Sequence, residues 1–239
     1  MKYIIFGGSS GLGLAISNYL SKNGNEIIIY DIKEPIINIT NSTYKFIDLS
    51  KSDLSVIKDD IESSNGLIYT AGIGKVKRFE DYTMDEIDAT ITINLSSLIK
   101  VLTLASNKLK GKDDFDCLCI SSIAGLVSSP LFSLYSASKA GVCKYIEAVN
   151  TELIKNGSNN RITNVVATAF KGTGFNGGQT DLNQLEDFAI ELINSMHNKE
   201  LVHKVNQELI DSILKRYNDD AMKFSLESYD YKINSGRIK

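Results

Sequence analysis

Residues 2–13 read KYIIFGGSSGLG, a short apolar run followed at once by a glycine-rich turn. Such a run is typical of a buried strand, and clustered glycines mark the turn that ends it. Apolar residues then recur at helical spacing in LGLAISNYL, residues 12–20. The stretch therefore predicts a strand, a tight turn and a helix from about Ser10 to Ser21.

The spacing of the glycines in this turn suits a bound dinucleotide. One glycine allows the tight turn, a second lets the backbone approach the pyrophosphate, and a third lets the helix pack closely on the strand. Gly7, Gly11 and Gly13 fit these three duties, and the hydroxyls of Ser9 and Ser10 would add donors beside the phosphates. The free N–H groups and the positive dipole end of the helix would point the same way. Because similar turns also join strands to helices without any ligand, the turn alone leaves both interpretations open.

A second apolar run, EIIIY (26–30), ends in Asp31, 18 residues after Gly13. An acidic residue at about this distance meets the adenosine ribose in NAD-binding proteins. A carboxylate there accepts a hydrogen bond from the 2′-OH and repels a 2′-phosphate, so Asp31 favours NAD over NADP. The alternative is that Asp31 only starts a turn, and Lys33 nearby would weaken the repulsion.

Apolar runs alternate with helical periodicity along the whole chain. Further strands are expected at 43–48, 66–70, 115–121 and 161–168, and helices around 11–21, 53–63, 83–109 and 135–155. This alternation favours an α/β fold, a Rossmann-like doubly wound parallel sheet with helices on both faces. Ligands should then gather at the carboxyl ends of the strands. No break in composition divides the chain, which predicts a single domain over residues 1–239.

Composition narrows the classes of function. The 26 basic and 29 acidic residues give a net charge of −3, which does not indicate a broad nucleic-acid surface. No apolar run approaches about 18 residues, so no membrane span is expected. Three cysteines without CxxC spacing, at 117, 119 and 143, favour reduced thiols and a cytoplasmic location. His197 and His203 lack partners at metal-ligand spacing, so both are expected at the surface and no metal site is predicted.

A tyrosine and a lysine lie four residues apart in YSASK (135–139), thirteen residues after Ser122 in ISSIAG (120–125). On a helix this spacing puts Tyr135 and Lys139 on one face. Hydride transfer to a carbonyl requires a proton for the forming alkoxide, and the reverse reaction requires a base. A tyrosine with its ordinary pKa of about 10 is a weak base at neutral pH, and a neighbouring cation favours its phenolate. The pair therefore indicates redox chemistry on an alcohol or a carbonyl.

In order and at these spacings, the motifs resemble those of the short-chain dehydrogenase/reductase family over about residues 1–185. The matching positions are Gly7, Gly11, Gly13, Asp31, Asp48–Leu49, Ala71–Gly72, Asn94, Ser122, Tyr135 and Lys139. The resemblance implies an NAD(P)-dependent oxidoreductase that interconverts an alcohol and a ketone or aldehyde, with NAD(H) preferred over NADP(H). It also implies a homodimer or homotetramer formed through the helices that carry Asn94 and Tyr135. We expect a small-molecule carbonyl or alcohol as the partner, and neither nucleic acid nor membrane.

By this resemblance, Tyr135 is the acid/base, while Lys139 lowers its pKa and holds the nicotinamide ribose. Ser122 orients the substrate oxygen and stabilises its developing charge. Ser121 is its rival, and the thirteen-residue offset to the tyrosine selects Ser122. Asn94 supports a water-mediated proton path to the lysine, or it only binds a neighbouring backbone group, as a helical asparagine can.

The cofactor contacts implied by the resemblance follow several strands. Asp48 meets the adenine amino group, with Leu49 beside the ring, unless Asp48 only caps the next helix. Thr173 contacts the nicotinamide carboxamide. The full predicted set is Gly7, Ser9, Ser10, Gly11, Leu12, Gly13, Asp31, Asp48, Leu49, Ala71, Gly72, Tyr135, Lys139 and Thr173.

Three positions depart from the family pattern. Phe6 stands for the usual threonine before the first glycine, Tyr69–Thr70 for an Asn–Asn pair, and Thr168–Ala169 for Pro–Gly. Packing of Phe6 against Tyr69 or Thr70 would replace a hydrogen bond between the first turn and the fourth strand, and the Ala169 methyl disfavours positive φ. These changes keep open a second function, that of a nucleotide-binding regulatory or scaffold protein with weakened catalysis.

The substrate wall and the C-terminal region are less well defined. Ala124, Leu126, Phe132 and the glycine-rich loop 170–180 are expected to form the wall, and its phenylalanines, Phe170 and Phe175 with Phe132, line a pocket or pack on the core. Residues from about 185 to 239 resemble the family least, and its usual last strand is missing. Their pattern predicts helices in 186–196 and 206–217. Segment 223–233 is expected to form a replacement edge strand or to dock on a second subunit.

Overall fold

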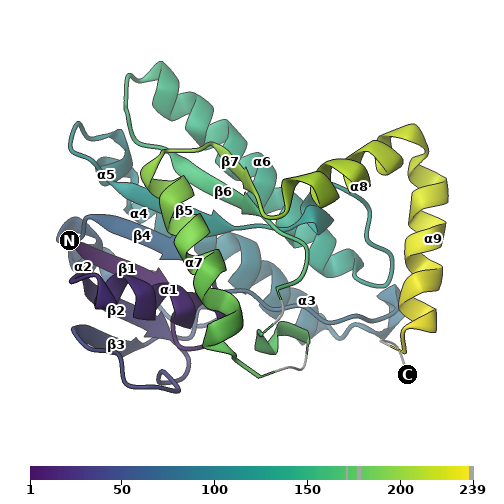
Figure 1. Ribbon diagram of the computed structural model, residues 1–239, viewed down its shortest axis with the longest axis horizontal. Coiled ribbons are helices and arrows are strands. Elements are labelled where there is room, and N and C mark those ends of the chain that lie inside the picture. Colours follow the sequence, from purple (N-terminus) through teal and green to yellow (C-terminus); the bar gives the residue numbers. More distant parts are fainter. Residues whose placement is uncertain (171, 177–178, 237–239) are drawn as a thin grey trace.

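The centre of the molecule is one parallel β-sheet (Figure 1). A computed structural model describes residues 1–170, 172–176 and 179–236 of the chain. In these residues seven strands pair in the order β3-β2-β1-β4-β5-β6-β7. Their bounds are β1 Lys2–Phe6, β2 Glu26–Asp31, β3 Ser42–Phe46, β4 Gly66–Tyr69, β5 Asp116–Ile120, β6 Ile162–Val166 and β7 Val202–Lys204. The strand order reverses beside β1, which is the doubly wound arrangement predicted from the alternating pattern.

Helices cover both faces of this sheet, as predicted, and each face has its own apolar cluster (Figure 1). The cluster on one face includes residues of α2, α4 and α6, and the cluster on the other includes residues of α1 and α7. The helices are α1 Gly11–Lys22, α2 Lys58–Glu62, α3 Met84–Ile91, α4 Ser97–Leu104, α5 Ser106–Lys110, α6 Ser133–Lys155, α7 Leu182–His197, α8 Gln207–Asp219 and α9 Ala221–Asn234. A π-helical turn, Thr92–Ser96, joins α3 to α4.

Three aromatic rings lie side by side across β2, β1 and β4. Phe6 pairs in register with Tyr30 and Tyr69, and its ring stacks on theirs at centroid distances of 5.3 and 5.6 Å. The predicted packing of Phe6 against Tyr69 is confirmed. The hydrogen bond between the first turn and β4 is nevertheless kept, because the Thr70 hydroxyl donates to the carbonyl oxygens of Phe6 at 2.9 Å and Gly7 at 3.1 Å. The threonine that makes this hydrogen bond thus follows β4, at position 70, whereas the family pattern has it at position 6, at the end of β1.

The C-terminal segment is helical, so the predicted edge strand over 223–233 is wrong. Side chains at 224, 225, 228, 229 and 232 are at least partly buried, which is a helical repeat, and Asp220 caps α9 by accepting from the Lys223 N–H. The edge of the sheet is formed by the short β7, parallel to β6. On α9, Lys232 Nζ donates to Ser129 Oγ at 2.8 Å and to the Pro130 carbonyl at 2.7 Å. The helix therefore docks near the carboxyl edge of the sheet.

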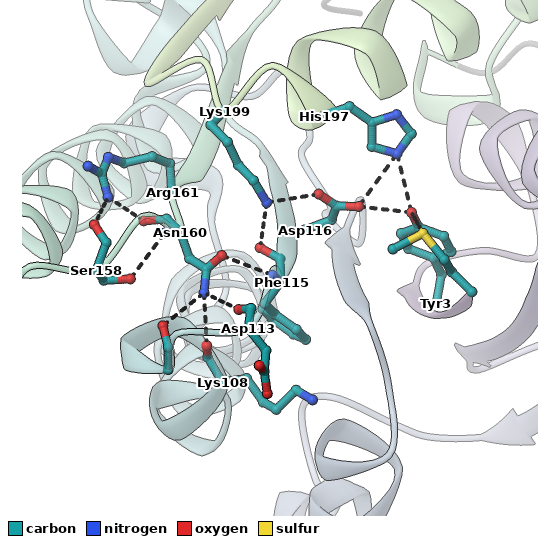
Figure 2. Close-up of polar contacts among 12 residues, drawn as sticks. Tyr3, Lys108, Asp113, Phe115, Asp116, Ser158, Asn160, Arg161, His197 and Lys199 are labelled. Atoms are coloured by element: carbon teal, nitrogen blue, oxygen red, sulfur yellow. Dashed lines mark hydrogen bonds and ion pairs between the residues drawn. The ribbon is translucent and has the colours of Figure 1, made fainter.

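At the opposite end of the sheet, where the strands begin, polar side chains bind one another (Figure 2). Asp116, at the start of β5, accepts from the Tyr3 hydroxyl at 2.9 Å and from Lys199 Nζ at 3.0 Å. His197 is exposed, as predicted, and its Nε2 lies 3.5 Å from the same carboxylate. His203 differs from the prediction, because its imidazole is largely buried between two glutamates.

Asn160 fastens the loop that precedes β5 (Figure 2). Its Nδ2 donates to the carbonyl oxygens of Lys108 at 3.1 Å and Asp113 at 2.9 Å, and its Oδ1 accepts from the Phe115 N–H at 2.9 Å. Because this amide is buried, Asn160→Ala should lower the free energy of unfolding by about 3 kcal/mol in urea denaturation. The exposed Asn156, whose side chain donates to the Glu152 carbonyl of its own helix, is the control, and Asn156→Ala should cost less than about 0.5 kcal/mol. Equal losses in the two variants would contradict this account of the loop.

Candidate active site

Tyr135 and Ser122 meet at the carboxyl edge of the sheet. Ser122 follows β5, Tyr135 lies in the first turn of α6, and the Ser122 side chain is close enough to the phenol to lower its pKa. Ser121 instead donates to the Val165 carbonyl at 3.0 Å, within the sheet. The structure therefore places the serine selected by the thirteen-residue offset, and not its neighbour, against the phenol.

The phenol of Tyr135 is held in its protonated form. Its side chain is buried, and this burial raises its pKa to about 12, although the nearby Ser122 hydroxyl acts in the opposite direction. Phe132 stacks on the ring with a centroid distance of 4.3 Å. At neutral pH such a group is a proton donor rather than a base.

Lys139 is buried one helical turn further along α6. Its Nζ donates to the Ile120 carbonyl at 2.7 Å and lies 5.7 Å from the centroid of the Tyr135 ring. Burial lowers the pKa of Lys139 to about 8. A Cβ placed at Gly72 would lie 3.5 Å from both Lys139 Nζ and Asn94 Oδ1, so these two polar groups flank the same glycine. The lowered tyrosine pKa expected from this lysine stays a prediction for the cofactor complex.

Asn94 lies in the π-helical turn and is fully buried. Its Nδ2 donates to the Ile73 carbonyl at 2.8 Å and to Ser138 Oγ at 3.0 Å, while its Oδ1 accepts from the Ile73 N–H at 2.8 Å. The Tyr69 hydroxyl donates to the neighbouring Ile93 carbonyl at 2.7 Å and so supports the turn. Asn94 thus binds a neighbouring backbone segment, which was the second of the two roles expected for it, and it lies beside Lys139. Its part in proton transfer stays a prediction.

Two glycines of the first turn perform the steric duties expected of them. Gly7 has a φ of +80°, and a Cβ there would lie 2.7 Å from the Ala71 nitrogen. At Gly13 a Cβ would lie 2.1 Å from the Gly7 carbonyl oxygen. Any side chain at Gly13 would therefore separate α1 from β1.

Gly11, at the start of α1, faces the loop that follows β6. Its N–H donates to the Thr180 hydroxyl at 2.9 Å, and a Cβ at Gly11 would lie 3.6 Å from Thr173. The structure therefore brings Thr173 to the glycine turn. It also adds Thr180, whose contact across about 170 residues has no local signal beyond its place in a glycine-rich loop.

The two predicted acidic cofactor residues stand at the ends of neighbouring strands. Asp31 accepts from the Ser9 N–H at 3.0 Å and from the Ile32 N–H at 2.7 Å. Asp48 accepts from both the N–H and the hydroxyl of Ser50, and these hydrogen bonds lower its pKa. Asp53 caps the following helical turn, so the alternative expectation that Asp48 is only a helix cap is wrong. Leu49 packs against the apolar cluster beside it.

A pocket of about 470 Å³ opens beside Tyr135. It is lined by Gly74, Lys75, Val76, Lys77, Glu86, Phe132 and Phe175. Phe132 and Phe175 therefore line a pocket, which was one of the two positions expected for these phenylalanines. Phe170 does not, because its ring packs edge-on against Phe188 of α7 at 5.3 Å. The sequence pattern missed the pocket residues of segment 74–77, which follows β4 and contains two lysines.

The family model for short chain dehydrogenases matches residues 2–181. The chain belongs to the short-chain dehydrogenase/reductase family. It is 28% identical over 170 residues to D-beta-hydroxybutyrate dehydrogenase of Rhizobium meliloti, a match that covers 64% of this chain and 66% of that protein. The matched stretch thus spans slightly less than two thirds of the relative's length.

Two solved structures show the same fold as this short-chain dehydrogenase. One is a short-chain dehydrogenase from Burkholderia cenocepacia in complex with NADP, with a TM-score of 0.77, 15% identity, and coverage of 95% of this chain and 96% of that one. The other is 4-hydroxyisoleucine dehydrogenase complexed with NADH and succinate, with a TM-score of 0.68, 21% identity, and coverage of 85% and 96%. Structures of this fold therefore hold either cofactor.

The remaining departure of this short-chain dehydrogenase from its family is tolerated locally. Ala169 replaces the usual glycine after β6, but it is not among the described non-glycine residues that have positive φ. The backbone there needs no left-handed conformation, so the extra methyl causes no strain.

Proposed function

We propose that this chain is an NAD(H)-preferring oxidoreductase that interconverts a small-molecule alcohol and the corresponding ketone or aldehyde. The observation that carries the proposal is the environment of Tyr135. Its side chain is buried with a raised pKa, lies near Ser122, and has its ring centroid 5.7 Å from Lys139 Nζ. The proposed acid Tyr135, the hydroxyl of Ser122 and the cation of Lys139 thus lie together at the carboxyl ends of the strands, where ligands bind in such sheets.

The proposed mechanism divides the reaction between the cofactor and these side chains. The nicotinamide, when bound, supplies or accepts the hydride. In reduction Tyr135 gives its proton to the carbonyl oxygen, because its raised pKa keeps the phenol protonated until charge develops. The Ser122 hydroxyl, now 3.4 Å from the Ala167 carbonyl, would turn to donate to the same oxygen. Lys139 would stabilise the phenolate left behind, and Asn94 holds the neighbouring Ile73 backbone and Ser138 in place.

The first turn fits the phosphates of a dinucleotide. Because α1 begins at Gly11, the Leu12 N–H has no acceptor inside the helix, and the positive dipole end favours an anion, while the Gly11 N–H donates to the Thr180 hydroxyl. The Ser9 hydroxyl is buried without a hydrogen-bond partner among the described residues. Ser10 precedes α1 without a side-chain capping bond. Both hydroxyls are thus available to phosphate oxygens.

Preference for NAD(H) is proposed from Asp31 at the end of β2. We expect Asp31→Ala to weaken NADH binding about 10- to 100-fold, because a charge-assisted hydrogen bond to the ribose is lost. NADPH should bind relatively better, because the repulsion of its 2′-phosphate is also lost. The measurement is a titration of each cofactor followed by nicotinamide fluorescence.

The ratio of the two dissociation constants separates recognition from general damage. Asp53→Ala removes the same charge from an exposed helix cap and should leave that ratio unchanged. If Asp31→Ala weakens both cofactors equally, Asp31 is only a structural partner of the Ser9 N–H. If the wild-type protein binds neither cofactor, the oxidoreductase proposal fails and the regulatory or scaffold function replaces it.

We further propose a homodimer or homotetramer in the cytoplasm. No uninterrupted apolar run approaches about 18 residues, but among the described residues the helical run Met84–Leu104 is the one stretch whose length and mean hydropathy would let it cross a membrane, and about a third of it is buried in one chain. It contains the π-helical turn with Asn94 and contacts α6. Coverage of its remaining apolar surface by a second subunit would account for this composition, and light scattering of the purified protein would test it.

A further inference from the structure

The pocket beside Tyr135 combines an apolar wall with two lysines. Phe132 and Phe175 lie against the Tyr135 ring with centroid distances of 4.3 and 5.3 Å, and both line the pocket. Lys75 and Lys77 line the same pocket. A compound that reacts at the Tyr135 hydroxyl would therefore extend along the phenylalanines toward two ammonium groups.

These two lysines share one carboxylate. Lys75 Nζ lies 2.8 Å from one oxygen of Glu86, and Lys77 Nζ lies 2.8 Å from the other. Glu86 also accepts from the Thr83 N–H in the capping box of α3, so its position is fixed by the helix. The lysines hold the pKa of Glu86 at about 2, so it stays charged. Among the described residues of the pocket lining, the charged groups therefore leave one net positive charge.

Both ammonium groups have hydrogen-bonding capacity left. Each has three N–H donors. Among the contacts of the described residues, Lys75 uses one donor, on Glu86, whereas Lys77 uses two, on Glu86 and on the Asp81 carbonyl at 3.0 Å. The Lys77 side chain is 29% exposed, so solvent screens it only in part. The remaining donors suit the paired oxygens of a carboxylate.

We propose that this pocket binds the carboxylate of a short oxo or hydroxy acid through Lys75 and Lys77, with Phe132 and Phe175 against its carbon chain. The inference rests on the proposed oxidoreductase function, since the reacting carbon must face Tyr135. In reduction, hydride from NADH adds to the carbonyl carbon and the Tyr135 proton adds to the oxygen. The products are the hydroxy acid and NAD⁺, and the phenolate regains its proton from solvent.

Matched acids and esters test this charge recognition directly. The compounds are straight-chain 2-, 3- and 4-oxo acids of about five carbons, each with its methyl ester, assayed with NADH for kcat/KM. We expect the wild-type protein to prefer at least one acid over its ester by about tenfold or more. Lys77→Met and the double variant Lys75→Met/Lys77→Met should each reduce kcat/KM for that acid, by about 10- to 100-fold per lysine, and leave the ester unchanged.

Lys204→Met is the matched control. The Lys204 side chain is also 29% exposed, and it is paired with Asp211 at 2.6 Å, away from the pocket lining. This variant should keep the preference of the wild type. Equal turnover of acids and esters by the wild type, or a preference that survives the double variant, would overturn the carboxylate site and leave the oxidoreductase proposal standing. Absence of turnover for every compound would count against both.

Discussion

Tyr135→Phe is expected to lower kcat by about 10³- to 10⁴-fold, with a small change in KM. The substitution removes the proton donor and keeps the ring that packs against Phe132 and Phe175. Because the proton is needed in the transition state more than in the bound substrate, the loss should fall on kcat. Steady-state kinetics with NADH and any oxo compound that the wild type turns over would measure it.

A second tyrosine on the same helix provides the control for this variant. Tyr145 is partly buried against the apolar cluster, and Tyr145→Phe should leave kcat unchanged. Binding of NADH should be weakened only slightly in Tyr135→Phe, since Tyr135 is one of many predicted cofactor contacts and the first turn is untouched. Retention of more than about a tenth of the wild-type kcat would rule out Tyr135 as the general acid.

Lys139→Met is expected to reduce activity and to stabilise the fold. Loss of the cation beside the phenol should lower kcat/KM by about 100-fold or more. The free energy of unfolding at pH 7 should rise by about 1–2 kcal/mol, because a buried ammonium with a lowered pKa is removed at the cost of one hydrogen bond to the Ile120 carbonyl. A lysine kept only for structure would show the opposite, a loss of stability.

The gain in stability should depend on pH in a defined direction. The pKa of Lys139 is about 8 in the folded chain and 10.5 as its ordinary value, so the folded state binds fewer protons between these values. In the wild type, the loss of folding free energy that the buried Lys139 ammonium causes is largest below pH 8, and it decreases as the pH rises toward 10.5. Urea denaturation at several pH values should show the advantage of Lys139→Met shrinking over that window. Lys144→Met, at an exposed position of the same helix, should change neither stability nor activity.

The fold was largely predictable because strand and helix signals agreed along most of the chain. The run Tyr3–Phe6 with its glycine turn, and the alternation that followed, were sufficient for the doubly wound sheet and the helices on both faces. The C-terminal region was not predictable in the same way. KFSLESYDYKI satisfies both a period of two and a period near 3.6, and contacts such as that of Lys232 with Ser129 decide for the helix. The strand Val202–Lys204 is too short to produce a periodic signal.

The site was predictable where a motif has a fixed spacing and not where contacts join distant segments. Spacing alone placed Ser122 against Tyr135, whereas Thr180 reaches Gly11 only through the folding of a long loop. The lysines of segment 74–77 line the pocket because this segment, which follows β4, passes against Phe132 and Tyr135. Single-sequence patterns contain no information about such pairs.

The departures from the family pattern at Phe6, Tyr69 and Thr70 do not disrupt the first turn, so they are weaker evidence against catalysis than the sequence alone suggested. Thr70 supplies the hydrogen bond between the turn and β4 that Phe6 is unable to make, and Tyr69 fills the space with a stacked ring. The Tyr69 hydroxyl also supports the Ile93 carbonyl next to Asn94. These compensations favour the oxidoreductase over the scaffold function, since they preserve the geometry around the proposed catalytic residues.

Transfer of label from NADH that carries deuterium at both C4 positions would show whether the chain reduces a carbonyl with the help of Tyr135. Purified protein would be incubated with the labelled cofactor and the panel of oxo acids and esters, and products would be analysed by mass spectrometry. We predict a hydroxy product with deuterium on the former carbonyl carbon for the wild type, and its loss in Tyr135→Phe although that variant still binds NADH. Binding of NADH without transfer to any compound, or equal transfer by Tyr135→Phe, would contradict the proposed acid catalysis by this tyrosine.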